Sequence, residues 1–281
     1  MKKIIQYLFL LILPSITIAQ PDPCAGSNGV GSPQSRKPIP YPYVREADVM
    51  FSKRVWRTVM VDEKMNLLFK YATGTSNIGE HVSLIDALLC GISKGLITAY
   101  DATIDDGFTK SMSKEEVQRN LNGYLDTIKI PIPNSNQLKD TVVWKGKLNM
   151  NDIIMYRIKE DWYFDKHTGE MNVRILGICP VVMLRDEYGH LKEGYQPLFW
   201  IYFPAARNLL ANVDAFNNHN KDDRKSWDDI FINRLFSSYI YKTSNVMDKS
   251  ISDNVPGMNQ LIESQKVKDD LQNFEHDMWE Y

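Results

Sequence analysis

The residues that most often carry catalysis are present in this chain, but their spacing forms no known catalytic motif. There is no glycine-rich phosphate loop, nucleophile elbow, Cys-x-x-Cys pair or His-Glu-x-x-His sequence. His276 lies between two acidic residues, but neighbours on a helix point to different faces and cannot share one metal ion. A surface or structural role is therefore favoured for the scattered histidines, which are His81, His167, His190, His219 and His276.

Carboxylates and thiols give no stronger catalytic signal. Asp105–Asp106 and Asp228–Asp229 are adjacent in sequence, whereas acid–base catalysis needs groups placed across a cleft. Cys90 and Cys179 fall on apolar faces, which is typical of buried free thiols. A Cys90–Cys179 disulfide stays open as an alternative if the predicted helix lies on the predicted strand. We therefore predict no catalytic, metal-binding or cofactor-binding residue and no cofactor.

Aromatic residues beside arginines are the most distinctive chemical feature. They gather in YPYVREADVMFSKRVWRTV, residues 41–59, and recur on a strand predicted at residues 195–203. Such residues either pack in a core or form the exposed aromatic and arginine patches that protein interfaces favour. We hypothesise that residues 41–57 pack partly against another protein; the alternative is that Trp56 anchors the chain to its own core. The candidate interface residues are Tyr41, Tyr43, Arg45, Arg54, Trp56, Arg57, Trp200 and Tyr202.

The N-terminus predicts export of the chain. Lys2 and Lys3 precede an apolar run that ends in small residues, so residues 1–19 are predicted to be a signal peptide cleaved after Ala19. The run is short for a membrane span, and an uncleaved anchor is the less favoured alternative. Residues 20–44 are rich in Pro, Gly and Ser and predict a flexible arm. Residues 45–281 are expected to form one domain.

Composition and net charge indicate which classes of molecule the chain is suited to bind. The chain has 281 residues, 43% hydrophobic, with 33 Lys and Arg against 35 Asp and Glu. Two of the lysines belong to the signal segment, so the mature chain is mildly acidic and offers no general attraction to nucleic acid. No later apolar run is long enough to span a membrane.

Hydrophobic periodicity predicts helices, then strands, then helices. Residues 45–60 indicate a short helix that turns into a strand. Helical stripes follow Ser83 and Ser113, each with an acidic residue three positions on as a capping box. Alternating residues in 154–165, 171–184 and 195–203 predict an antiparallel meander of three or more strands. Later helices are predicted at 204–213, 227–242 and 258–281. The predicted fold class is α+β, with helices that precede and follow the meander.

Several stretches together resemble the gliding-motility protein family GldN, also called PorN. They are YPYVREADVMFSKRVWR, EKMNLL, GLITAYD, RIKEDWYFDK, FWIYFPAARNLLAN, SWDDIFINRLFSSYIYK and NFEHDMWEY. The resemblance runs from about Pro40 to Tyr281 in the family's order, and it is weakest from Gly107 to Lys147. It carries over no catalytic residues.

This resemblance implies a structural, periplasmic component of the type IX secretion system, associated with the outer membrane through a GldK/PorK-like lipoprotein in a ring. It also implies homo-oligomeric contacts and contact with a GldM/PorM-like periplasmic motor domain. No enzyme activity is expected. The alternatives are a glycan- or cell-wall-binding module that acts through exposed aromatic residues and, less favoured, a hydrolase.

Overall fold

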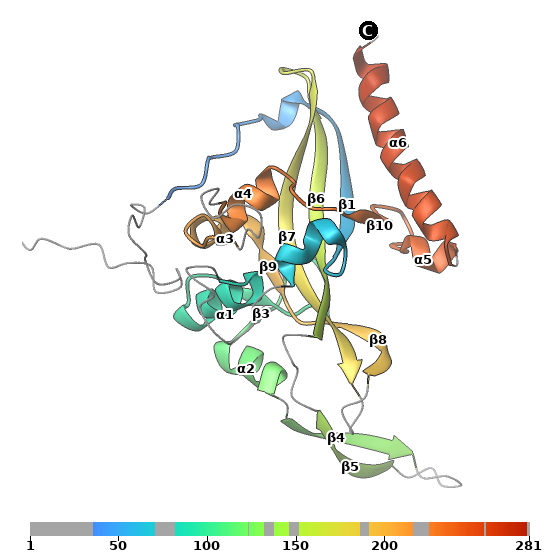
Figure 1. Cartoon of the computed structure of the whole chain (residues 1–281). Coiled ribbons are helices and arrows are strands. Elements are labelled where there is room, and N and C mark those ends of the chain that lie inside the picture. Colours follow the sequence, from blue (N-terminus) through green and yellow to red (C-terminus); the bar gives the residue numbers. More distant parts are fainter. Residues whose placement is uncertain are drawn as a thin grey trace, which may run out of the picture.

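The computed structural model describes residues 36–70, 82–122, 124–131, 138–145, 152–185, 191–215, 225–255 and 257–279 (Figure 1). The predicted signal peptide and residues 20–35 of the predicted arm lie outside these ranges. The rest confirms the predicted α+β class, because an antiparallel sheet carries helices that come before and after its central hairpin.

The main sheet has eight strands in the order β10-β1-β6-β7-β9-β2-β3, with β8 also paired to β7. Every described pair is antiparallel. The strands are β1 (Val49–Met60), β2 (Ala99–Tyr100), β3 (Ser111–Met112), β6 (Ile153–Asp165), β7 (Glu170–Arg185), β8 (Leu191–Pro197), β9 (Trp200–Tyr202) and β10 (Tyr239–Thr243). A separate two-stranded sheet pairs β4 (Tyr124–Pro131) with β5 (Leu138–Lys145).

The central hairpin follows the predicted alternation apart from two register shifts, between Ile153 and Met155 and between Lys159 and Glu160. β6 and β7 pair from Asp165↔Glu170 at the turn to Ile153↔Val182 at the far end. Gly169, at φ 70°, provides the left-handed conformation that this turn requires. The third predicted strand is divided in two: β8 begins at Leu191, earlier than expected, and the chain resumes pairing as β9. Both segments lie along β7, so the meander is confirmed with a break after Pro197.

Local capping explains the helices that precede the hairpin. α1 (Leu84–Lys94) begins after Ser83, whose hydroxyl accepts from the Asp86 amide at 3.2 Å, and ends at Gly95 with φ 73°. α2 (Lys114–Asn122) begins after Ser113, whose amide donates to Glu116 at 2.7 Å. The short helices η2 (Glu46–Asp48) and η3 (Lys64–Phe69) flank β1.

One predicted helix is wrong. Residues 227–242 form α4 (Trp227–Ile232) followed by strand β10, not a single helix. Arg234 has φ 53°, which breaks the helical path, and the aromatic and β-branched residues of β10 pair with β1 from Thr58↔Tyr239 to Val55↔Thr243. The other late helices are α3 (Phe203–Leu210), α5 (Ile251–Asn254) and α6 (Asn259–Trp279).

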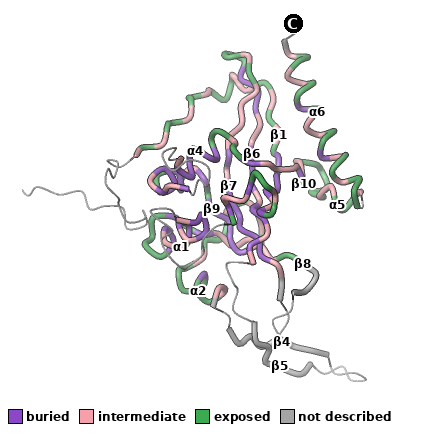
Figure 2. The backbone as a smooth tube through the Cα atoms, viewed as in Figure 1, coloured by how far each residue is buried: buried purple, intermediate pink, exposed green. Residues whose placement is uncertain are grey.

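The main core lies between one face of the sheet and the helices (Figure 2). Helices α1, α3 and α4 supply apolar side chains that pack against buried strand residues such as Tyr156, Ile158 and Ile178. Farther along the same face, Leu271 of α6 packs against Val55 and Ile240. Ser264 of α6 accepts a hydrogen bond from the Ile240 amide at 2.8 Å, so this helix also satisfies the outer edge of β10.

Candidate protein-interaction surface

The opposite face of the sheet carries a second, smaller apolar cluster. Its buried members are Trp56, Met155, Cys179, Val181 and Trp200. Because neighbouring strand residues point to opposite faces, Ile178 belongs to the main core while Cys179 belongs to this cluster. Among the described helices, none contributes a residue to the cluster. We call this surface the helix-free face.

A loop at residues 101–110 covers part of the helix-free face. Its Phe108 makes edge-on contacts with Tyr100, Trp200 and Tyr202, with ring centres 5.5, 6.2 and 5.5 Å apart. Phe108 has φ 59°, an unfavourable conformation for a bulky residue that such packing has to stabilise. A side chain at Gly177 would meet the ring, because an ideal Cβ there lies 2.6 Å from Phe108 Cζ.

Two aspartates hold the loop in shape. Asp101 accepts from the Thr103 hydroxyl at 2.6 Å, and this hydrogen bond lowers the pKa of Asp101. Asp105 accepts from the Thr109 hydroxyl at 2.5 Å and from the Gly107 amide at 2.9 Å. The Thr109 hydrogen bond is the main cause of the lowered pKa of Asp105. Both carboxylates therefore hold the loop through local hydrogen bonds.

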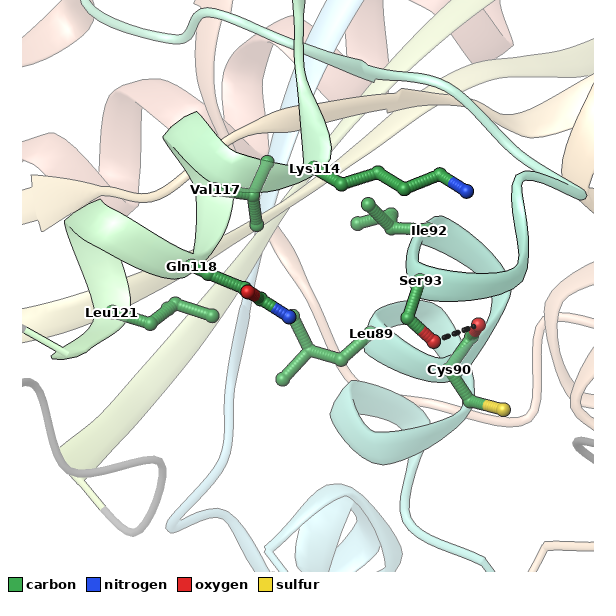
Figure 3. Close-up of a pocket in the computed structure, with 8 residues that line it drawn as sticks. All are labelled: Leu89, Cys90, Ile92, Ser93, Lys114, Val117, Gln118 and Leu121. Atoms are coloured by element: carbon green, nitrogen blue, oxygen red, sulfur yellow. Dashed lines mark hydrogen bonds between the residues drawn. The ribbon is translucent and has the colours of Figure 1, made fainter.

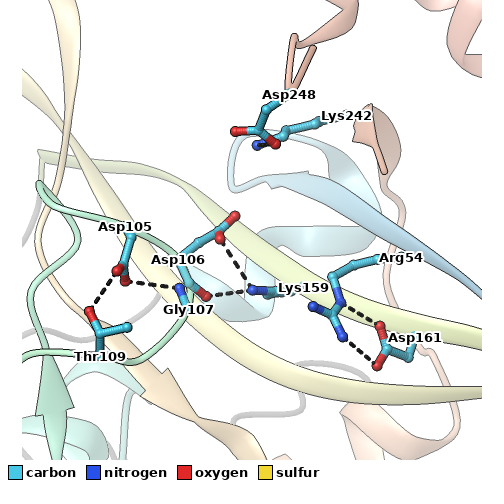
Figure 4. Close-up of polar contacts among 9 residues, drawn as sticks. All are labelled: Arg54, Asp105, Asp106, Gly107, Thr109, Lys159, Asp161, Lys242 and Asp248. Carbon is cyan, nitrogen blue, oxygen red and sulfur yellow. Dashed lines mark hydrogen bonds and ion pairs between the residues drawn. The ribbon is translucent and has the colours of Figure 1, made fainter. Parts of the chain in front are cut away.

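Lys159 ties the loop to the strands (Figure 4). Its ammonium group donates to the carbonyl of Asp106 at 2.5 Å and lies 3.2 Å from the Asp106 carboxylate. The side chain is 4% exposed. The charge also lies 5.6 Å from the centre of the Trp56 ring and 5.4 Å from that of Phe108. A lysine can be buried here because hydrogen bonds and two ring faces replace its hydration.

Two further cations on this face have carboxylate partners (Figure 4). Arg54 donates two hydrogen bonds to Asp161, at 2.6 and 3.0 Å, and the side-chain hydrogen bond raises the pKa of Arg54. Lys242 lies 4.6 Å from the centre of the Trp56 ring and pairs with Asp248 at 2.7 Å. Because these cations are neutralised in place, the face suits a protein partner better than a polyanion.

The segment that leads into β1 is fixed to its own domain at two points. The Asn212 side chain accepts from the Arg36 amide at 2.7 Å and donates to the Arg36 carbonyl at 3.1 Å. Farther along, the Tyr41 ring lies 4.4 Å from the Arg207 guanidinium carbon and 5.5 Å from that of Arg174. Arg174 also donates to the Pro42 carbonyl at 2.5 Å. Residues 36–42 therefore form a strap across the domain.

The structure divides the candidate interface residues into buried and accessible groups. Trp56, Arg57 and Trp200 are buried, and Arg57 donates to the Ser238 hydroxyl at 2.9 Å, so these three belong to the interior. Tyr41 is partly covered between its two arginines. The remaining four are accessible, although Arg45 pairs with Asp48 and Arg54 with Asp161; they are Tyr43, Arg45, Arg54 and Tyr202.

The sequence favoured buried free thiols at Cys90 and Cys179 and left a Cys90–Cys179 disulfide open as an alternative; the structure contradicts that alternative, and it also contradicts the free thiol at Cys90. Cys179 is a free, buried thiol, whereas Cys90 is disulfide-bonded. The helix that carries Cys90 packs on the main-core face of the sheet, while the side chain of Cys179 points to the helix-free face. The sheet therefore separates the two sulfur atoms.

An open groove of about 470 Å³ runs between α1 and α2 (Figure 3). Its lining is mainly apolar, and its polar groups do not converge on one point. The Ser93 hydroxyl donates to the Cys90 carbonyl of its own helix at 2.8 Å. Contrary to the sequence analysis, the chain does contain the letters of a nucleophile elbow, because residues 91–95 read GISKG. They lie in α1 and its C-cap rather than on the strand-to-helix turn that the motif requires. Ser93 is therefore not placed as a nucleophile.

The described histidines also lie apart. His167 follows β6 in the turn to β7, and His276 lies on α6, while the other three fall outside the described ranges. Within those ranges no group of three or more His, Cys, Asp or Glu side chains could hold a metal ion. None of the described helices is both long and apolar enough to cross a membrane.

Sequence patterns could not identify the residues that shape this surface. Phe108 comes from the stretch where the family resemblance is weakest, and Asp106 lies immediately before that stretch. Asn212 ends the family stretch FWIYFPAARNLLAN, but nothing in that stretch indicates that its side chain holds the Arg36 backbone. Alternation along β6 did place Lys159 on the face opposite Ile158.

Comparison with known proteins identifies the family to which the chain belongs. The family model described as gliding motility associated protein GldN matches residues 44–280. No curated protein matches the chain. The match covers nearly all of the described domain, from the end of the strap to the end of α6, and it confirms the resemblance. The chain therefore belongs to the GldN family of gliding-motility-associated proteins.

Proposed function

We propose that this chain is a non-catalytic structural subunit of the type IX secretion and gliding-motility machinery. In this proposal the mature chain resides in the periplasm and is held at the outer membrane by a GldK/PorK-like lipoprotein, with which it forms a ring. The observation that carries the proposal is the GldN family match over residues 44–280. A GldM/PorM-like motor domain is a further proposed partner.

The helix-free face supports a protein partner. Tyr202 is 40% exposed beside Phe108, and the Arg54 side chain is 43% exposed in its pair with Asp161. Aromatic and arginine side chains supply much of the binding energy at protein interfaces. The bidentate Arg54–Asp161 pair on this face is already formed, so a partner that covers it has fewer side chains to order on binding. We propose that the lipoprotein contacts this face.

The test is co-purification of the mature chain with the lipoprotein from an outer-membrane extract. The variant Arg54→Ala/Tyr202→Ala is expected to reduce the recovered complex at least tenfold, because the loss of two interface side chains typically costs about 1.4 kcal/mol or more. The matched control is Lys70→Ala, which removes another exposed, paired cation, the partner of Asp62. If the unaltered chain, the double variant and the Lys70→Ala control all recover the same amount of lipoprotein complex, the helix-free face is not the surface that the lipoprotein contacts. Failure of the unaltered chain to recover the lipoprotein would refute the proposed function.

A further inference from the structure

The β4–β5 hairpin stands apart from the rest of the fold. Its eight residue pairs run from Tyr124↔Lys145 to Pro131↔Leu138, and neither strand pairs with another described strand. Figure 1 shows the hairpin projecting beyond the end of the main sheet, on the side of β8. The hairpin is therefore a long two-stranded ribbon that receives little support from its own domain.

Such a ribbon is physically incomplete. An isolated hairpin in water is at best marginally stable, and three or more strands or a packed helix are normally needed. Each strand also has an outer edge whose amide and carbonyl groups pair with no other described strand. A third strand added along either edge would satisfy these groups and stabilise the ribbon.

The same chain offers a second incomplete edge. β8 pairs with β7 from Val181↔Pro197 to Arg185↔Leu191, and no described strand lies on its other side. Tyr195, near the middle of β8, is 55% exposed. β8 therefore ends the sheet at the same end of the molecule from which the hairpin projects (Figure 1).

We propose that the hairpin of one copy pairs with the β8 edge of a second copy. Within one copy the two do not pair, because β4 and β5 pair only with each other among the described strands. The donor and the acceptor are different segments of one chain, so the contact joins copies head to tail and repeats from copy to copy. The inference rests on the proposed function in one respect: it supplies the copy-to-copy contact of the proposed ring.

The first test replaces residues 124–145 with a short Gly-Ser linker in the mature chain. We expect the variant to keep the melting temperature of the unaltered chain, because the hairpin adds little packing to the domain. We also expect it to keep binding the lipoprotein in pairwise complexes but to lose the large assemblies in sedimentation. Large assemblies formed by the variant would overturn the inference while leaving the proposed function intact.

The second test leaves the hairpin in place and does not depend on the folding of the deletion variant. A photo-crosslinking benzoylphenylalanine replaces Tyr195 in assemblies of mixed isotopically light and heavy copies. We expect cross-links that join light to heavy chains, with the second attachment point inside residues 124–145. The matched control carries the same group in place of Met50, which is 54% exposed and lies at the other end of the sheet.

The cross-linked products distinguish between the possible partners of the β8 edge. Light-to-heavy products between residue 195 and the hairpin support a second copy as the partner. Products within one copy, products with the lipoprotein, or equal hairpin products from the Met50 control would each overturn the inference.

Discussion

Arg207 of α3 donates two hydrogen bonds to Asp228 of α4, from Nε to Oδ1 at 2.9 Å and from Nη2 to Oδ2 at 3.0 Å. Both side chains are 6% exposed. The outer face of the same guanidinium group meets the Tyr41 ring of the strap. One buried ion pair therefore connects two helices and the segment that precedes the domain.

Removing one partner of this pair should be strongly destabilising. Asp228→Ala leaves the Arg207 charge buried without its carboxylate, and we expect a loss of about 3–5 kcal/mol in the free energy of unfolding. The matched control, Asp161→Ala, breaks the more exposed Arg54 pair and should cost no more than about 1 kcal/mol. Urea unfolding followed by tryptophan fluorescence measures both. Equal losses in the two variants would show that burial does not increase the contribution of the Arg207–Asp228 pair to the free energy of unfolding.

The strap should be released by a change at Asn212. Asn212→Ala removes both hydrogen bonds to the Arg36 backbone, which are worth about 1 kcal/mol each. Trypsin cleavage after Arg36 should then become about tenfold faster or more, because cleavage follows local opening. The control is Asn245→Ala, which removes comparable side-chain hydrogen bonds in the turn after β10. Unchanged cleavage in Asn212→Ala would contradict the described anchoring.

Local signals made much of the fold predictable. Ser83 and Ser113 marked their helix starts because a capping hydroxyl acts on the amides of the next turn. Alternation along most of β6 and β7 predicted the hairpin, since successive residues of a half-buried strand point to opposite faces. It could not predict the two register shifts in their pairing. The resemblance, carried by motifs spread from Pro40 to Tyr281, predicted the family.

Long-range partners were not predictable from such signals. Residues 239–243 have a helix-compatible pattern, and only pairing with β1 makes them a strand. The same limit applies to the candidate surface: alternation assigned Trp200 to one face of its strand, but the loop that covers it through Phe108 lies far away in sequence. The Cys90–Cys179 alternative could not be decided from the sequence, because periodicity shows that a face is apolar without showing which face of the sheet the helix covers.

The Phe108 ring should limit the size of the side chain that the protein tolerates at position 177. Gly177→Ala places a methyl group against the Phe108 ring, and we expect a loss of about 1–3 kcal/mol in stability from overpacking. Gly107→Ala in the same loop is the control, because the nearest atoms to a Cβ there are 3.6 Å away. Adding Phe108→Leu should recover part of the Gly177→Ala loss in thermal unfolding. No recovery would mean that the clash lies elsewhere.

Acid should loosen the loop at residues 101–110. The folded-state pKa values of Asp101 and Asp105 are lowered, so the stability they contribute is present above their ordinary value of about 3.9 and is lost as the pH falls through the lowered values. NMR titration of the carboxyl carbons measures both values. Thr109→Val should raise the pKa of Asp105 and leave Asp101 unchanged. A titration of Asp105 at its ordinary value in the unaltered chain would refute this account.

Cys179 should be unreactive in the folded protein. Burial raises the pKa of its thiol to about 12, so almost no folded molecule carries the reactive thiolate at pH 8. Iodoacetamide should label Cys179 only after urea unfolds the chain, as peptide mass spectrometry would show. An exposed cysteine introduced by Ser252→Cys should react at once in the folded state. Rapid native labelling of Cys179 would contradict its burial.

The same raised pKa predicts a stability that depends on alkaline pH. An unfolded thiol ionises near pH 8.5, while the folded thiol stays protonated to about 12, so the unfolded state binds fewer protons between these values. The contribution of Cys179 is therefore complete below about pH 8.5 and falls as the pH rises, by about 1.4 kcal/mol per unit. Urea unfolding at pH 8 and pH 10 should show a smaller decline for Cys179→Ala than for the unaltered chain. Tyrosines titrate in the same range in both proteins, so the difference between the two declines isolates the thiol. Parallel declines would mean that Cys179 ionises as readily in the folded chain as in the unfolded one, and would contradict the raised pKa.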